Sequence, residues 1–243
     1  LYEYDFKHQK LANFVARQQY WILEPYNDLY QVIDRSIKQR LENRLDGITM
    51  LLSGGLDSNI ILHHIKDYEP EILTIENGES HVVEQVMEEY QLNARYISDE
   101  YTTTDVKQAM YHYEHPLDYG SFIPNYLLFK EATNSMVLTG DGADELFGGY
   151  ERAQLEDTFM FDIMELQYYH NIRLDRMSMA WTKEARSPLM SMPLARIARR
   201  LGKHLRTNKH ILRQLYKDKL PTTVTTQKKK PLRLYNDKEQ NIA

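Results

Sequence analysis

The chain of 243 residues is long enough to bury a large core, and its 42% hydrophobic and 27% charged residues are ordinary for a globular protein. It contains no cysteine, which excludes disulfides, thiolate nucleophiles and cysteine-bound metals and suits a reducing compartment. The net charge of −5 gives no bulk reason to expect nucleic-acid binding, and no apolar run approaches the length of a membrane span. We therefore expect a cytoplasmic protein without nucleic-acid or membrane partners.

Hydrophobic periodicity predicts alternating helices and strands through the first 140 residues. Apolar residues at every fourth position from Leu29 to Leu41 predict an amphipathic helix, which Asp46-Gly47 separates from a buried strand. Strands are predicted at 48–52, 71–76, 94–97 and 136–139, with helical patterns around Ile60, Val82, Val106 and Tyr126. This alternation indicates an α/β fold, in which helices cover both faces of a parallel, twisted sheet.

The remaining third of the chain has a different pattern. No convincing strand follows Tyr150, and helices are predicted at 159–169, 193–201 and 210–220, so we expect a helical C-terminal part. The run Lys228-Lys229-Lys230 before Pro231 is a local block of like charge. Such a run usually lies on a solvated surface.

The stretch SGGLDS, residues 53–58, directly follows the first predicted strand and opens a helix. Ser53, Gly54 and Gly55 would present successive backbone N–H groups that bind anionic oxygens, although a plain strand-to-helix turn uses the same residue types. Asp57 would repel a bound phosphate unless a cation lay between them. The economical interpretation is a phosphate together with Mg²⁺. The stretch does not match the GxxxxGK[ST] phosphate loop.

The second glycine-bearing turn runs from Gly140 to Glu145 and packs three carboxylates into five residues at the end of a predicted strand. One of Asp144 and Glu145 could cap the next helix, which leaves the other acids unexplained. Clustered acids at a ligand edge favour a metal or a general base, and Mg²⁺ fits because it takes one or two carboxylates plus substrate phosphates. Since parallel sheets bind ligands beyond the carboxyl ends of their strands, we expect both turns to open onto one edge.

These residues resemble those of a known family. SGGLDS looks like the pyrophosphate-binding loop of N-type ATP pyrophosphatases, which have an adenine nucleotide alpha hydrolase-like fold. Together with TGDGADELFGGY at 139–150 and DRMSMAWTKEARSP at 175–188, it resembles the synthetase domain of class B asparagine synthetases, a group that includes β-lactam synthetases and lasso-peptide cyclases. The resemblance extends from Gln19-Tyr20-Trp21 to Leu220-Pro221, so we expect this domain over 21–243.

The resemblance implies ATP-dependent activation of a carboxylate as an acyl-adenylate, followed by attack of ammonia or an amine. Asp57 and Asp144 would hold Mg²⁺. Asp141 would take a proton from the amine, and Lys229 would steady charge on the phosphate and the tetrahedral intermediate. Glu184, in the family's Glu-x-Arg, would brace the active site. The implied ATP-binding residues are Ser53, Gly54, Gly55, Asp57 and Ser58 at the pyrophosphate end and Leu52, Ile75 and Gly140 at the adenosine.

The chain departs from the family pattern in two places. Residues 188–191 read Pro-Leu-Met-Ser where the family usually has Pro-Phe-Leu-Asp, and Gln227 stands where an arginine usually precedes the lysine. Three consecutive lysines leave Lys228 as an alternative to Lys229. Residues 1–10 resemble the closing strands of a glutaminase domain, so we expect 1–20 to be its end or remnant. Nitrogen would come from free ammonia, a substrate amine, or a glutaminase domain or partner subunit.

Several functions remain open at this point. The leading one is an asparagine synthetase-like ligase that joins aspartate to ammonia. The alternative is a macrolactam or isopeptide synthetase, of the lasso-peptide cyclase or β-lactam synthetase kind, that acts on a peptide or natural-product acid. Asp141, where β-lactam synthetases carry tyrosine, argues against a β-lactam synthetase. A non-catalytic binding module is disfavoured because both acidic motifs are intact.

Overall fold

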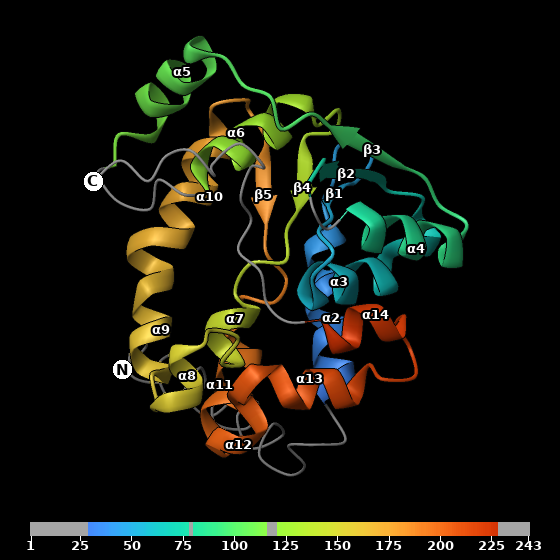
Figure 1. The fold of residues 1–243 in the computed structure, drawn as a ribbon, viewed down its shortest axis with the longest axis vertical. Helices are drawn as coiled ribbons and strands as arrows, with labels where there is room; N and C mark the ends of the chain where they lie inside the picture. The colour runs from blue at the N-terminus through green and yellow to red at the C-terminus, as the bar shows by residue number, and fades with distance from the viewer. Residues whose placement is uncertain (1–28, 78–79, 116–120, 228–243) are drawn as a thin grey trace, which may run out of the picture.

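The computed structural model describes residues 29–77, 80–115 and 121–227 (Figure 1). At its centre is a five-stranded sheet in the order β3-β2-β1-β4-β5, and every neighbouring pair is parallel. The strands are β1 (Thr49–Leu51), β2 (Glu71–Ile75), β3 (Ala94–Ile97), β4 (Met136–Leu138) and β5 (Glu184–Arg186). The predicted α/β fold class is confirmed, and four of these strands lie where the sequence predicted them.

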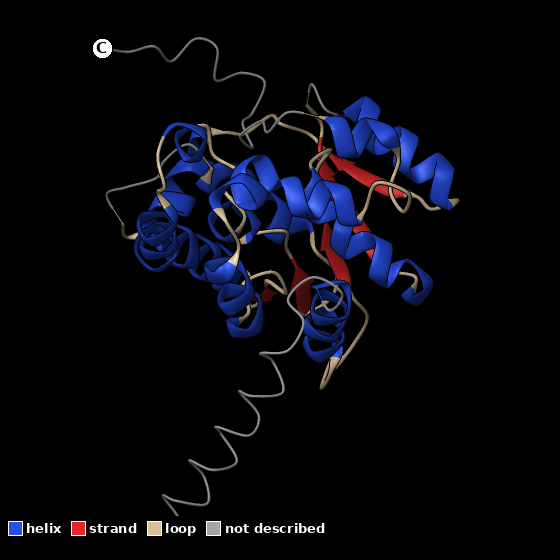
Figure 2. Ribbon diagram, turned by 90° about the horizontal axis from the view of Figure 1, so that it is seen from below, coloured by secondary structure: helices blue, strands red, loops and turns tan. Residues whose placement is uncertain are grey.

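Helices cover both faces of the sheet because successive strand residues point to opposite sides (Figure 2). Met50 belongs to the core cluster on one face and Leu51 to the cluster on the other. The first face packs against α2 (Leu29–Leu41), α3 (Leu56–Ile65) and α4 (Ser80–Tyr90). The second packs against α5 (Thr103–Tyr113), α6 (Phe122–Glu131) and α10 (Asn171–Met179). All three residues of β1 are buried, as expected of a strand covered on both faces.

The strand order reverses between β1 and β4. From β1 the chain moves outward to β2 and β3 and then returns to place β4 on the other side of β1. The segments that follow β1 and β4 therefore leave the sheet side by side at its carboxyl edge. Open α/β sheets bind ligands at such a reversal point. The two turns singled out in the sequence occupy it.

Strand β5 contradicts the expectation that no strand follows Tyr150. It is an edge strand that pairs in parallel with β4. Its sequence, Glu-Ala-Arg, has none of the apolar alternation on which strand prediction depends. The strand forms because β4 offers backbone partners: the Glu184 N–H donates to Ser135 O (2.8 Å) and the Thr139 N–H donates to Arg186 O (3.0 Å).

The C-terminal part is helical, as predicted, with different boundaries. The predicted helix at 159–169 is α9 (Phe159–Glu165), which continues through a π-helical turn at Leu166–His170 into α10. Pro124 lies within the first turn of α6 (Phe122–Glu131), where its missing N–H costs no intrahelical bond. The other helices are α7 (Ala143–Leu146), α8 (Arg152–Leu155), α11 (Met192–Arg200), α12 (Lys203–Arg206), α13 (His210–Leu215) and α14 (Thr222–Thr226), with 3-10 turns at Lys66–Tyr68 and Thr207–Lys209.

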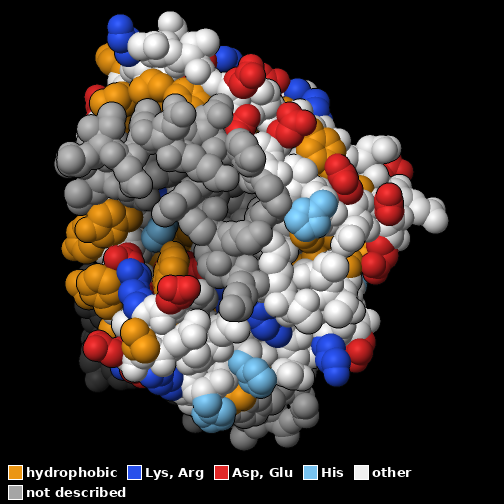
Figure 3. Space-filling model, in the orientation of Figure 1, with side chains coloured by type: hydrophobic (Ala, Val, Ile, Leu, Met, Phe, Trp, Pro, Cys, Tyr) orange, Lys and Arg blue, Asp and Glu red, His pale blue; other side chains and the backbone are white. Residues whose placement is uncertain are grey.

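Helix α9 carries an exposed apolar face. Met160, Phe161 and Met164 are each more than half exposed, and Figure 3 shows hydrophobic side chains over this helix at the left of the view. The helices of the described ranges are all too short or too polar to cross a membrane.

A buried histidine joins α2, α3 and α13. His64 Nδ1 lies 3.1 Å from Asp34 Oδ1, and Nε2 lies 2.8 Å from the Tyr216 hydroxyl. The His64 side chain is 3% exposed and Tyr216 is fully buried. An Nδ1–H donated to the Asp34 carboxylate leaves Nε2 to accept the phenol proton, so the three groups satisfy one another. This contact fixes the C-terminal end of α13 against the sheet-covering helices.

Replacing Tyr216 by phenylalanine removes the phenol donor and leaves His64 Nε2 buried without it. We expect the free energy of unfolding to fall by about 1–3 kcal/mol, measured by urea denaturation at neutral pH. Tyr111→Phe is the matched control, because Tyr111 is 75% exposed on α5. Equal stability of Tyr216→Phe and the parent would show that the contact contributes nothing.

Candidate active site

A cavity of about 290 Å³ opens at the carboxyl edge of the sheet, beyond the ends of β1, β2 and β4. Helix α6 supplies Asn125 to its wall, and α10 supplies Arg173. Most of the sequence-predicted site residues line it: Leu52, Ser53, Gly54, Asp57, Ser58, Ile75, Gly140, Asp141 and Asp144. The structure thus brings the two predicted turns to one cavity.

Two predicted residues do not line this cavity, and a third lies outside the described residues. Gly55 is the N-cap of α3 and does not line the cavity. Glu184 lies at the amino end of β5, away from the cavity, with its side chain 65% exposed. It pairs with Arg186 (2.8 Å), whose Nη1 donates to the carbonyl of Arg40 at the end of α2, so Glu184 braces this arginine instead of touching the cavity. Lys229 and its alternative, Lys228, lie outside the described residues.

The SGGLDS loop is closed by its own hydroxyl groups. The Ser53 N–H donates to Ser58 Oγ (3.1 Å), and the Gly55 N–H donates to Ser53 Oγ (3.2 Å). Ser58 Oγ donates in turn to Ser53 O (3.1 Å). Two of the N–H groups expected to bind anionic oxygens are therefore directed at serine oxygens here, and an anion would replace those oxygens as acceptor.

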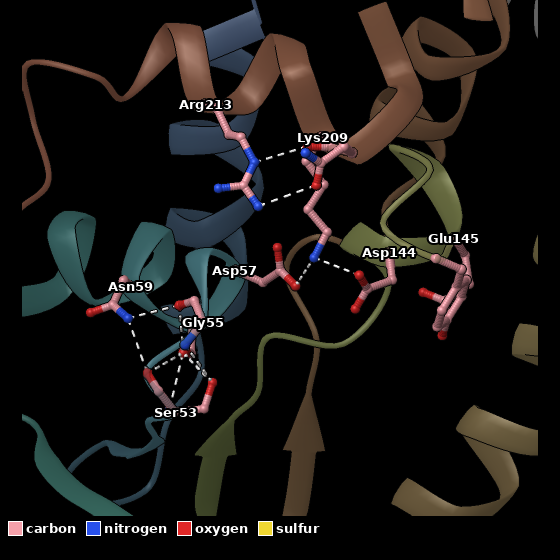
Figure 4. Close-up of polar contacts among 11 residues, drawn as sticks. Ser53, Gly55, Asp57, Asn59, Asp144, Glu145, Lys209 and Arg213 are labelled. Carbon is pink, nitrogen blue, oxygen red and sulfur yellow. Dashed lines mark hydrogen bonds and ion pairs between the residues drawn. The ribbon is translucent and has the colours of Figure 1, made fainter. Parts of the chain in front are cut away.

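Asn59 holds this loop in place, and sequence reasoning missed it. Its Nδ2 donates to Ser53 O (3.0 Å) and to Gly55 O (2.7 Å), and the residue is completely buried (Figure 4). One side chain in the first turn of α3 thereby fixes the carbonyls on both sides of Gly54. An asparagine one residue beyond the motif gave no signal, because it looks like an ordinary polar helix residue.

Two glycines allow the elements around the cavity to approach closely. A Cβ on Gly140 would lie 2.9 Å from Ser58 N, so the β4 turn touches the start of α3 only because this residue is glycine. A Cβ on Gly149 would overlap Asp144 Oδ1. Because Gly149 has no side chain, the Asp144 carboxylate has room to turn toward α3.

Lys209 lies between the two predicted metal ligands. Its Nζ is 2.5 Å from Asp57 Oδ2 and 2.6 Å from Asp144 Oδ1 (Figure 4). The side chain of Lys209 is only 5% exposed, and the two carboxylates are 14% and 10% exposed. Two carboxylates predicted to share Mg²⁺ therefore share an ammonium group.

These two carboxylates fit a magnesium ion whose remaining coordination positions are filled by a bound substrate and water. Asp57 and Asp144 already face one cation, and Mg²⁺ is commonly held by one or two carboxylates plus substrate phosphates. The described part of the chain contains no cluster of three or more His, Asp or Glu side chains that could hold a metal. Phosphate oxygens and water would therefore supply the remaining ligands.

The backbone at Lys209 is in an uncommon conformation. Asn208 and Lys209 both have φ of 54°, in the left-handed region that few residues other than glycine adopt. The Asn208 N–H donates to Gly148 O (2.8 Å), the Lys209 N–H donates to Phe147 O (3.0 Å), and Arg213 Nε donates to Asn208 O (2.9 Å). The first two bonds attach the segment before α13 to the GDGADELFGGY turn. They join residues at least 60 positions apart, which is why the sequence alone did not predict the contact.

Three further titratable groups, Glu145, Tyr150 and His170, line the cavity. The Tyr150 hydroxyl donates to Glu145 Oε1, and His170 Nε2 lies 3.3 Å from both oxygens. Glu145 is 3% exposed. Burial and the neighbouring Asp144 raise the pKa of Glu145 to about 7. Burial and Glu145 also raise the Tyr150 pKa well above its usual range, so the phenol remains a donor.

Asp141, the predicted proton acceptor, is paired with an arginine. Its Oδ1 lies 3.3 Å from Arg173 Nη2, and the arginine side chain is 7% exposed. Both residues line the cavity. Arg173 thus fixes the direction of the Asp141 carboxylate, and its role as a base stays a prediction.

Known proteins are similar in sequence to this chain. The asparagine synthase family profile matches residues 28–161 and 152–240. Asparagine synthetase B [glutamine-hydrolyzing] of Escherichia coli K12 is 25% identical over 244 residues, covering 84% of this chain and 44% of that protein. Asparagine synthetase [glutamine-hydrolyzing] 1 of Bacillus subtilis 168 is 33% identical over 110 residues, covering 41% of this chain and 17% of that protein. A putative asparagine synthetase [glutamine-hydrolyzing] 1 of Methanocaldococcus jannaschii is 29% identical over 201 residues, covering 71% and 36%. This chain spans less than half the length of each relative.

Ionised Glu145 should oppose folding. Its carboxyl has a pKa of 4.5 when unperturbed and about 7 in the folded chain, so the stability gained from the protonated form is complete below pH 4.5 and is lost as the pH rises through 7. Glu145→Gln stays neutral and keeps an acceptor for Tyr150. Between about pH 5 and pH 8 we expect its free energy of unfolding to rise relative to the parent by up to about 3 kcal/mol.

This prediction is checked by urea denaturation at both pH values without metal or nucleotide. Glu151→Gln is the control, because Glu151 is close to Glu145 in the chain and is exposed. A difference between Glu145→Gln and the parent that does not change with pH would contradict the raised pKa of Glu145.

Proposed function

The chain belongs to the asparagine synthase family, and we propose that it is an ATP-dependent ligase that activates a carboxylate as an acyl-adenylate and joins it to ammonia or an amine. One observation carries this proposal: the SGGLDS loop, Asp57 and Asp144 meet around a single cavity where the strand order reverses. A helix start rich in N–H and hydroxyl donors suits phosphates, and two facing carboxylates suit the Mg²⁺ that accompanies them.

In the first half-reaction, the SGGLDS loop would bind the β- and γ-phosphates, and Leu52, Ile75 and Gly140 would line the adenosine. An oxygen of the substrate carboxylate attacks the α-phosphorus. A new C–O–P linkage forms, the bond from the α-phosphorus to the bridging oxygen breaks, and pyrophosphate leaves. Asp57 and Asp144 would hold Mg²⁺, which supplies positive charge to the phosphates when it is bound. Lys209 supports the departure of pyrophosphate by adding a further positive charge beside it.

In the second half-reaction, the amine nitrogen attacks the acyl carbon. A C–N bond forms, the C–O bond to the phosphate breaks, and AMP leaves. The nitrogen gives up a proton, and we assign its acceptance to Asp141, which Arg173 orients within the cavity. By resemblance to the family, Lys229 would stabilise the tetrahedral intermediate.

Aspartate and ammonia are the first substrates to test, because the relatives are named asparagine synthetases. Free ammonia in the assay takes the place of any glutaminase domain or partner subunit that would otherwise supply the nitrogen. A peptide or natural-product acid forms a second arm of the same assay. The choice of acid then follows from which one supports adenylation.

The proposal is tested by exchange of labelled pyrophosphate into ATP in the presence of Mg²⁺ and each acid. We expect exchange with aspartate, and a fall of about a hundredfold or more in Asp57→Asn and in Asp144→Asn, because each loses a charge that holds the metal beside the phosphates. Asp67→Asn is the control, since the Asp67 side chain is 88% exposed on the surface. Exchange with a precursor peptide alone would overturn the asparagine assignment, and no exchange with any acid would overturn adenylation.

A further inference from the structure

Two cations compete for one place in this cavity. Lys209 Nζ lies 2.5 Å from Asp57 Oδ2 and 2.6 Å from Asp144 Oδ1. A Mg²⁺ ion held by the same oxygens at about 2.1 Å would occupy nearly the same point. The ammonium group and the metal therefore cannot bind both carboxylates at the same time.

We propose that Lys209 is a placeholder cation, which pairs with Asp57 and Asp144 until a nucleotide binds and so makes metal binding conditional on the nucleotide. This inference rests on the proposed function, because the phosphates of the nucleotide are the new partner of the ammonium group. Once phosphates lie on the SGGLDS loop, Nζ turns to their oxygens and the metal takes the two carboxylates. The two carboxylates thus have a cation between them at each stage.

The site without nucleotide resists the metal for an electrostatic reason. Removing the ammonium group from two largely buried carboxylates is unfavourable unless the charge finds another partner. A metal that enters without phosphate drives the ammonium away and gives it no anion in exchange. With phosphate present, the displaced charge gains an anion of its own.

The local structure allows the side chain to move while its backbone stays in place. The Lys209 N–H is fixed to Phe147 O, and the preceding Asn208 is fixed to Gly148 O and by Arg213. Arg213 cannot easily replace the lysine, because its guanidinium also donates to Thr225 O (2.6 Å). Lysine suits a change of partner because its charge is compact and sits on four flexible methylenes.

The carboxylates need a cation at every stage. Asp57 and Asp144 face one point from two elements. Like charges this close and this buried repel one another strongly. A chain that lacks the lysine charge should therefore draw a divalent ion into the gap even without nucleotide.

The test measures binding of Mn²⁺, a spectroscopic substitute for Mg²⁺, from the electron paramagnetic resonance signal of the free ion. The parent and Lys209→Met are each titrated with and without α,β-methylene-ATP, which cannot release pyrophosphate, and Mn²⁺ bound by the nucleotide alone is measured separately and subtracted. We expect the parent to bind Mn²⁺ only with the nucleotide. We expect Lys209→Met to bind Mn²⁺ without nucleotide about tenfold or more tightly than the parent, because no ammonium has to be displaced.

Two further variants locate the effect. Lys209→Met combined with Asp144→Asn should lose the gained affinity, because one of the two carboxylates is then uncharged. Lys219→Met is the matched control: this lysine lies over the Tyr30 ring, and its replacement should leave Mn²⁺ binding as in the parent. If Lys209→Met does not fold without metal, Lys209→Gln, which keeps a hydrogen-bond donor, is titrated in its place with the same expectation.

The proposal is overturned if the parent binds Mn²⁺ equally well with and without nucleotide, or if neither Lys209 variant binds the free ion more tightly than the parent. Pyrophosphate exchange and this titration can fail separately. Loss of exchange with every acid rejects adenylation, whereas the comparison of the parent with the Lys209 variants without nucleotide tests the placeholder directly.

Discussion

The ion pairs of Lys209 with Asp57 and Asp144 connect three parts of the chain that are distant in sequence. Asp57 comes from the first turn of α3, Asp144 from α7, and Lys209 from the segment before α13. The loops after β1 and β4 can meet there only because the strand order reverses between these strands. The C-terminal helical part then contributes the cation that two adjacent carboxylates require, so the strand order of the sheet brings together charges that compensate one another in the cavity.

Other contacts keep this arrangement in register. Gly140 lets the β4 turn touch the start of α3, and Gly149 leaves room for the Asp144 carboxylate. Helix α13 is anchored at both ends, by the bonds around Lys209 and by Tyr216 against the buried His64. Because this short helix is fixed at both ends, the backbone of Lys209 at its N-terminus lies at a constant distance from α3. The site is therefore positioned by packing some way from the cavity as well as by the residues that line it.

The sequence predicted the parts of this site that depend on local pattern. Apolar runs followed by glycine predicted the loops after β1 and β4. These loops were expected at one edge because the carboxyl ends of parallel strands lie at the same edge of a sheet. Strand β5 was missed because its three residues depend on β4 for pairing, not on their own apolarity. Lys209 was missed because its partners are distant in sequence, and Asn59 was missed because it looks like an ordinary polar residue of a helix. The grouping of Glu145 with His170 likewise requires the turn from α9 into α10 to fold back on the β4 turn.

The most direct measurement is a crystal structure with Mn²⁺ and α,β-methylene-ATP, in which anomalous scattering locates the metal. The predicted result is a peak between the carboxylates of Asp57 and Asp144, phosphates on the SGGLDS loop, and Lys209 Nζ moved from the carboxylates to a phosphate oxygen. A structure in which Nζ still bridges the two carboxylates while the metal and the phosphates bind elsewhere would contradict both the assignment of the cavity and the role of Lys209.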